Sequence, residues 1–144
     1  MTLDGAVRET EFYNGEVYDA TVDLEQISWH KAAKEQVKLQ PEILAQYGAP
    51  VKAHEVFHPV SVTKAPSGVL IYDFGQNFAG VVSAKIKGKK GQKITFRHAE
   101  ILMDGELFTK PLRSAKQEAV YICRDGEQTW SPSCLLYTSD AADE

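Results

Sequence analysis

The sequence predicts an all-β protein of the antiparallel β-sandwich class. Short segments alternate apolar and polar residues, Gly and Pro separate them, and after Gly48 no stretch of about 12 residues has helical period. The chain has 144 residues, of which 43% are hydrophobic and 25% charged, as in globular domains and unlike disordered segments. This length accommodates one ordinary domain, or one and a half small ones.

The N-terminal part predicts a hairpin followed by a linker. Asn14-Gly15 is a strong turn signal because both residue types accept positive φ, and residues 16–22 have the period of a strand. Residues 24–38 are ambiguous, although residues 29–35 could form one or two helical turns. Pro and Gly residues then interrupt the pattern, and we predict a domain boundary after residue 48.

The C-terminal part predicts a series of strands. Residues 82–86 place an apolar row on one face and a polar row on the other, residues 88–91 are expected to close a hairpin, and residues 93–99 form the next strand. Residues 69–74 and 119–123 are nearly continuous apolar or aromatic runs, which predicts strands covered on both sides.

Several classes of function are excluded by charge and by motif. The net charge of −4 provides no basic field for nucleic acid or an anionic membrane, and no apolar run approaches the roughly 20 residues that span a bilayer. Asp73-Phe74-Gly75 is the tripeptide that holds magnesium in protein kinases, but the other kinase motifs are missing. The lysine-rich segment 88–93 lacks the spacing of a phosphate-binding loop.

The first residues lack the basic and apolar regions of a secretory signal, which favours a cytoplasmic location. The two cysteines, Cys123 and Cys134, are too few for a disulfide framework, so we expect reduced, structural thiols.

The sequence supplies weak candidates for metal ligands and for catalytic carboxylates. His54 and His58 precede Pro59, which disfavours the helix that would align them, while His98 and Glu100 share a predicted strand face but are too few for a site. The carboxylates are Asp73, Glu100, Asp104 and Glu106. Asp104-Gly105 predicts a turn, and a buried Asp73 or Glu100 would accept hydrogen bonds from the backbone or from Arg97 or Arg113.

We therefore assign no catalytic residue, no cofactor-binding residue and no metal ligand, and we expect no cofactor.

Five motifs follow one another along the chain. They are Tyr13-Asn14-Gly15-Glu16-Val17-Tyr18-Asp19-Ala20, Ala49-Pro50-Val51, Asp73-Phe74-Gly75-Gln76-Asn77 with Gly80, Arg97-His98-Ala99-Glu100 with Leu112-Arg113-Ser114-Ala115, and Thr129-Trp130-Ser131-Pro132. In this order they resemble the bacterial α-L-rhamnosidases, which are inverting glycoside hydrolases. The resemblance implies that residues 1–48 end an N-terminal β domain and that residues 49–133 form most of a jelly-roll or concanavalin-like β-sandwich, incomplete at both ends.

The same resemblance implies a function for the intact protein. It would hydrolyse terminal α-L-rhamnosyl groups of glycosides or polysaccharides, with the acid and base on a helical barrel that lies outside this chain. This chain would then be an inactive scaffold, and its partner, a rhamnose-containing glycan, would bind the catalytic domain. One alternative is a free-standing carbohydrate-binding module with an aromatic platform drawn from Tyr72, Phe74, Phe78 or Phe108. Another is a β-sandwich interaction domain of unrelated function.

The last segment, residues 134–144, resembles the conceptual translation of a transposon-end adapter used in DNA library preparation. A strand pattern stops at Pro132 and no periodicity follows. We expect these residues to be an artefact and exclude them from the fold.

Overall fold

A computed structural model describes residues 5–11, 13–23, 25–26, 31, 33–34, 41–45, 47–49 and 52–133. These residues form ten strands and one short 3-10 helix, η1 (Lys110–Leu112), which confirms the all-β class. The strands are β1 (Val7–Glu11), β2 (Gly15–Asp19), β3 (Ser61–Lys64), β4 (Leu70–Asp73), β5 (Ala84–Gly88), β6 (Lys93–Arg97), β7 (Leu102–Met103), β8 (Glu106–Leu107), β9 (Glu118–Ile122) and β10 (Gly126–Trp130).

Two predicted segments fall outside this description. Residues 134–144 and most of residues 29–35 are not among the described positions. Within the described ranges, no helix has the length and apolar character needed to cross a membrane.

The larger layer is a four-stranded sheet in the order β1-β2-β9-β6. β1 and β2 form an antiparallel hairpin, as predicted, and Glu11 pairs with Gly15. Gly15 has a φ of +99°, whereas Asn14 stays at negative φ, so only one of the two predicted turn residues adopts the left-handed region. β6 and β9 are also antiparallel.

One pair in this sheet departs from the predicted antiparallel arrangement. β2 and β9 run parallel over five residue pairs, from Gly15 with Glu118 to Asp19 with Ile122. A hairpin can join only antiparallel neighbours, and these two strands are separated by most of the chain. The pair also connects strands on the two sides of the predicted boundary at residue 48, and the boundary itself stays a prediction.

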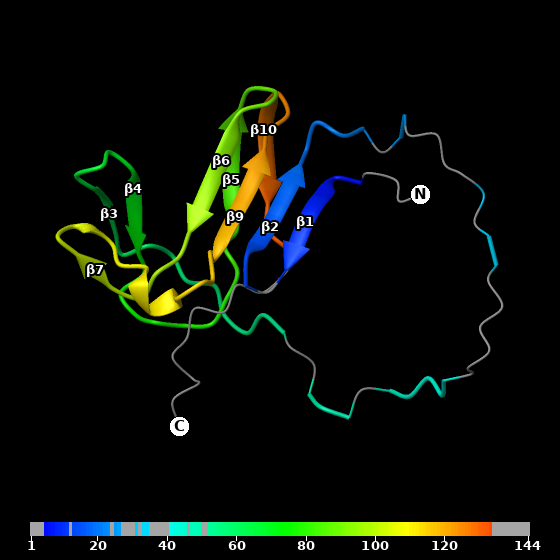
Figure 1. Ribbon diagram of the computed structural model, residues 1–144. Coiled ribbons are helices and arrows are strands. Elements are labelled where there is room, and N and C mark those ends of the chain that lie inside the picture. Colours follow the sequence, from blue (N-terminus) through cyan, green and yellow to red (C-terminus); the bar gives the residue numbers. More distant parts are fainter. Residues whose placement is uncertain are drawn as a thin grey trace.

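The smaller layer is the antiparallel pair β5 and β10, which lies against the larger sheet (Figure 1). The core between the layers is centred on Trp130, which is 7% exposed. Its ring lies 5.0 Å from Tyr121, 5.9 Å from Phe96 and 6.1 Å from Tyr18, measured between centroids. Aromatic pairs at such distances add to the stability gained from buried area. Strands from both layers therefore share one core, as a sandwich requires.

The predicted hairpin at residues 88–91 is wrong. β5 pairs with β10 and β6 pairs with β9, so this turn carries the chain from one layer to the other. The turn is closed locally by a hydrogen bond from Gln92 N–H to the Lys89 carbonyl, at 2.9 Å. It is also tied to the next turn, where Gly91 N–H donates to the carbonyl of Cys123 at 2.8 Å. Period-two alternation identifies which face of a strand is buried, but it does not identify the strand's partner.

The predicted double coverage of residues 69–74 is also wrong. Of the residues in β4 only Ile71 is buried, at 8% exposure. β9 is closer to the prediction, because Ala119 and Tyr121 are buried and its other residues are half-buried. The apolar run alone does not distinguish a central strand from an outlying hairpin.

Two small hairpins, β3–β4 and β7–β8, lie at one side of the sandwich (Figure 1). The predicted turn at Asp104-Gly105 joins β7 to β8, with φ values of +54° and +77°. The two hairpins are linked where Ser67 donates from its N–H and its hydroxyl to the carboxylate of Glu106, at 2.6 and 2.9 Å.

Candidate functional site

The four aromatic residues considered as a sugar platform do not share one exposed surface. Tyr72 is 54% exposed on β4, whereas Phe74, Phe78 and Phe108 are half-buried. The ring of Phe78 packs edge-on against Phe74 at 5.5 Å and tilted against Phe57 at 4.9 Å, measured between centroids. These three rings, two of which belong to the loop after β4, pack against one another and do not form a flat face for stacking.

The loop at residues 73–80, which carries the central sequence motif, is built by local geometry. The Asp73 side chain accepts a hydrogen bond from Gly75 N–H at 2.7 Å, and Gly75 has a φ of +76°. Gly80 packs closely against Phe78, because a Cβ added at Gly80 would lie only 3.0 Å from the Phe78 ring. The motif therefore specifies a turn and an aromatic cluster, and its acidic residue is engaged in the turn.

The remaining candidate carboxylates are placed in turns and connections. Glu106 holds the β3–β4 turn, Asp104 lies in the β7–β8 turn, and Glu100 is exposed in a bend. Arg97 was predicted to pair with Asp73 or Glu100, and the structure shows a different partner. Its Nε donates to Glu118 at 2.8 Å, across the β6–β9 pair.

The histidines considered as metal ligands lie on two segments far apart in the sequence. His54 and His58 are exposed in the extended stretch before β3, and β6 ends at Arg97, so the prediction that His98 and Glu100 share a strand face is wrong. Across the part of the chain that the structure describes, no group of three His, Cys, Asp or Glu side chains could hold a metal ion. Cys123 is a fully buried free thiol, and burial raises its pKa.

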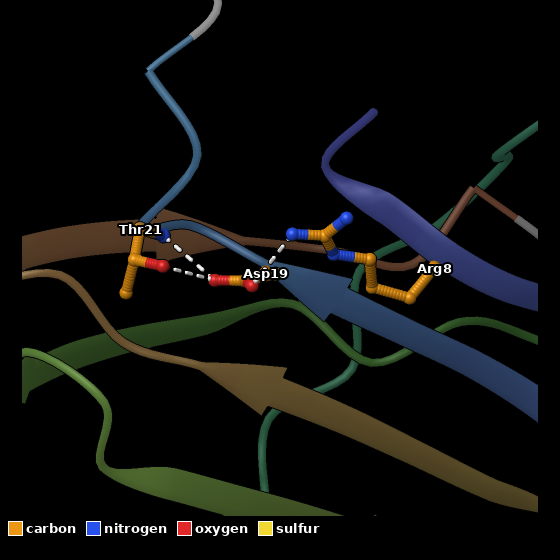
Figure 2. Close-up of polar contacts among 3 residues, drawn as sticks. All are labelled: Arg8, Asp19 and Thr21. Carbon is orange, nitrogen blue, oxygen red and sulfur yellow. Dashed lines mark hydrogen bonds and ion pairs between the residues drawn. The ribbon is translucent and has the colours of Figure 1, made fainter. Parts of the chain in front are cut away.

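Asp19, at the end of β2, organises the start of the following loop (Figure 2). Its carboxylate accepts hydrogen bonds from the hydroxyl and the N–H of Thr21, at 2.6 and 3.0 Å. Arg8 of β1 forms an ion pair with the same carboxylate at 3.2 Å. Burial alone would raise the pKa of Asp19, but the Thr21 bonds and the Arg8 charge outweigh it, and the pKa is lowered below its ordinary value of 3.8.

Glu16 is a buried carboxylate that sequence reasoning did not single out. It is 2% exposed, and its Oε2 accepts hydrogen bonds from the N–H of Ser133, at 3.0 Å, and from the Ser133 hydroxyl. These bonds attach the residues after β10 to the beginning of β2. The signal in the sequence was its place in the strand: Glu16 and Tyr18 are two apart, so they share the inward face.

Gln117 and His98 meet just beyond the ends of β9 and β6. Gln117 has a φ of +48°, and its carbonyl lies 3.2 Å from Nδ1 of His98. The Oε1 atom of Gln117 is buried without a hydrogen-bond partner among the described residues. Burial lowers the pKa of His98 below its ordinary value of 6.5, and the contact with the Gln117 carbonyl offsets this only in part.

A depression of about 380 Å³ lies over the four-stranded sheet, on the face away from the core. Four glutamates and one lysine contribute to its lining: Glu9, Glu11, Glu16, Glu118 and Lys116. Glu11 is already used, since its carboxylate accepts hydrogen bonds from the N–H groups of Tyr13 and Asn14. Glu118 is likewise paired with Arg97. Glu11 and Glu118 therefore serve the β1–β2 turn and the β6–β9 pair.

Comparison with protein families places residues 63–138 in the bacterial alpha-L-rhamnosidase concanavalin-like domain. The matched segment covers more than half of the chain. The chain belongs to this family. Strands β4 to β10 lie within the matched residues and β3 starts two residues before them, whereas β1 and β2 of the four-stranded sheet lie outside the match.

Curated relatives carry the same family name along nearly the whole chain. An alpha-L-rhamnosidase of Streptomyces avermitilis is 30% identical over 89% of this chain, and one of Alteromonas sp. is 28% identical over 94%. The chain spans only 13% and 16% of the length of these two proteins.

Solved structures agree with this assignment. A structure of the Streptomyces avermitilis alpha-L-rhamnosidase complexed with L-rhamnose has a TM-score of 0.75 and 29% identity, over 90% of this chain and 14% of that one. The native enzyme of Aspergillus terreus has a TM-score of 0.71 and 31% identity, over 90% and 16%. A match over 90% of the chain extends well beyond residues 63–138, the segment that the family comparison matches.

Proposed function

We propose that this chain is a non-catalytic scaffold segment of an α-L-rhamnosidase. The observation that carries the proposal is the family match together with its coverage: the chain is a concanavalin-like β-sandwich that spans about a seventh of its curated relatives. The complete protein would hydrolyse terminal α-L-rhamnosyl groups of glycosides or polysaccharides with inversion. Its partner would be a rhamnose-containing glycan bound by the catalytic domain.

The chemistry explains why a scaffold role fits these residues. Inverting hydrolysis needs two carboxyl groups, an acid beside the leaving oxygen and a base that activates water on the opposite face of the sugar. Here Asp19, Asp73 and Glu106 are engaged in turns and connections, and Glu16 is buried under Ser133. Carboxylates used in this way stabilise strand ends, so the acid and base would come from outside this chain.

The test is hydrolysis of a chromogenic α-L-rhamnoside. We expect no detectable release of the chromophore by the 144-residue chain. We also expect activity from a chimera of the Streptomyces avermitilis enzyme in which residues 52–133 of this chain replace the matching segment. Turnover by the isolated chain at enzyme-like rates would contradict the proposal, because the acid and base would then have to lie within it.

A further inference from the structure

One face of the β3–β4 hairpin is apolar and exposed. The antiparallel register places Val62 opposite Tyr72 and Lys64 opposite Leu70, and the period of the strand puts Val60 in the same row. Val60 is 70% exposed, Val62 53%, Leu70 59% and Tyr72 54%. We call these four side chains, Val60, Val62, Leu70 and Tyr72, the hairpin face.

The hairpin is fixed to the rest of the molecule through its other side. Ile71 points away from the hairpin face and is 8% exposed, and Ala65, the residue after β3, is 5% exposed. The turn between the strands is held by the two hydrogen bonds from Ser67 to Glu106. The hairpin face is thus presented to solvent by a segment that is anchored at both its turn and its back.

The hairpin face continues into the aromatic cluster below it. A Cβ at Gly75 would lie 3.3 Å from the Val60 side chain, so the loop that carries Phe74 and Phe78 passes directly beside Val60. In an antiparallel hairpin with one solvated side, the solvent row is normally polar. On this side of β3 and β4, Lys64 is the one charged side chain, and its neighbours Val62, Leu70 and Tyr72 are apolar or aromatic. Contiguous exposed apolar surface of this kind marks an interface.

We propose that the hairpin face is an interdomain interface, covered by the part of the α-L-rhamnosidase polypeptide that lies outside this chain. The inference rests on the proposed function. The curated relatives are about seven times longer than the segment matched here, so most of the surface that could cover the hairpin belongs to polypeptide outside it. A sugar fits less well, because a sugar site combines an aromatic ring with convergent polar groups, whereas Tyr72 is flanked by Val62 and Leu70.

The experiment measures cysteine alkylation in two settings, the isolated chain carrying Cys134→Ser and the Streptomyces avermitilis chimera described above. Val62→Cys reports on the hairpin face, and Lys85→Cys, on the exposed face of β5, is the matched control. Peptide-resolved mass spectrometry separates these positions from the buried Cys123. We expect alkylation at Val62→Cys to slow on the order of ten-fold in the chimera relative to the isolated chain, with a much smaller change at Lys85→Cys.

Each outcome decides the proposal. Equal alkylation at Val62→Cys in the isolated chain and in an active chimera would overturn the interface alone. Protection that appears only with added rhamnose, or that rises with the concentration of the isolated chain, would assign the face to a sugar or to a second copy and would also overturn it. A folded but inactive chimera would instead count against the proposed function.

A second measurement keeps the proposal testable if the chimera does not fold. In the solved Streptomyces avermitilis structure, the residues that superpose on Val62, Leu70 and Tyr72 should lose most of their exposed area when the rest of that chain is included. If they remain exposed there, the proposal fails.

Discussion

At the scale of single residues, Gln128 shows how one buried side chain closes a turn. Its Oε1 accepts hydrogen bonds from the Arg124 N–H and the Tyr121 hydroxyl, at 3.0 and 3.1 Å. Its Nε2 donates to the carbonyls of Arg124 and Gly126, at 2.8 and 3.0 Å. A buried amide with every atom paired adds stability and fixes the geometry of the turn between β9 and β10.

His98 is expected to make stability depend on pH. Its folded-state pKa is lowered by burial, so the unfolded chain binds the proton more readily. The contribution of His98 to the free energy of unfolding is therefore complete above its ordinary pKa of 6.5 and is lost as the pH falls from there toward the lowered value. The slope is at most about 1.4 kcal/mol per pH unit for one proton.

Urea unfolding between pH 7.5 and about pH 5 tests this expectation, because carboxylates titrate mostly below that range. His98→Gln should flatten the slope of stability against pH, whatever its effect at pH 7.5. His58→Gln, at an exposed position, should leave the slope unchanged. A slope that is the same in the His98→Gln variant as in the parent chain would show that this histidine does not titrate differently in the folded state.

At the scale of elements, the parallel contact between β2 and β9 depends on a missing side chain. A Cβ at Gly15 would lie 1.9 Å from the carbonyl oxygen of Glu118, which is backbone and cannot move aside without shifting β9. Gly15 also has a φ of +99°, where side chains are strained. The glycine therefore serves both the β1–β2 turn and the approach of β9.

Gly15→Ala should destabilise the chain far more than Gly126→Ala. Gly126 has a similar φ of +93° but open space around it, so its substitution costs only the backbone strain, about 1–2 kcal/mol. At Gly15 the same strain is added to the clash with β9, and we expect loss of the folded state. Far-UV circular dichroism during urea unfolding measures both variants. Similar midpoints would mean that β2 and β9 are not in close contact in solution.

The sequence predicted strand positions better than strand partners, and particular elements show why. The β7–β8 turn was predictable because Asp104-Gly105 acts locally, through positive φ. The layer change at residues 88–91 was not, because it depends on the contact between Gly88 and Cys123, 35 positions apart in the sequence. Glu16 was overlooked for the same reason: its partner, Ser133, is 117 residues away.

At the scale of the whole molecule, the two layers of the sandwich are unequal. Four strands form one layer, but among the described residues only β5 and β10 form the layer that covers it. As a result Tyr18, Ile94 and Phe96 are only partly buried although they pack against the core. The hairpin face adds exposed apolar surface at one side. A core that is covered over part of its area gains less from burial, while the entropy cost of ordering the chain is unchanged.

The isolated chain should therefore be marginally stable and prone to associate. We expect a broad thermal transition at moderate temperature, accompanied by light scattering, because unpaired strand edges and exposed apolar residues favour contacts between chains.

Replacing two members of the hairpin face, with Val62→Thr and Tyr72→Thr, should reduce scattering and leave the midpoint nearly unchanged, since both side chains are already more than half exposed. Thr129→Ser, on the exposed face of β10, is the control and should change neither quantity. A sharp cooperative melt well above about 50 °C without scattering would contradict this expectation, because it would mean that the two unequal layers suffice for an ordinary stable domain.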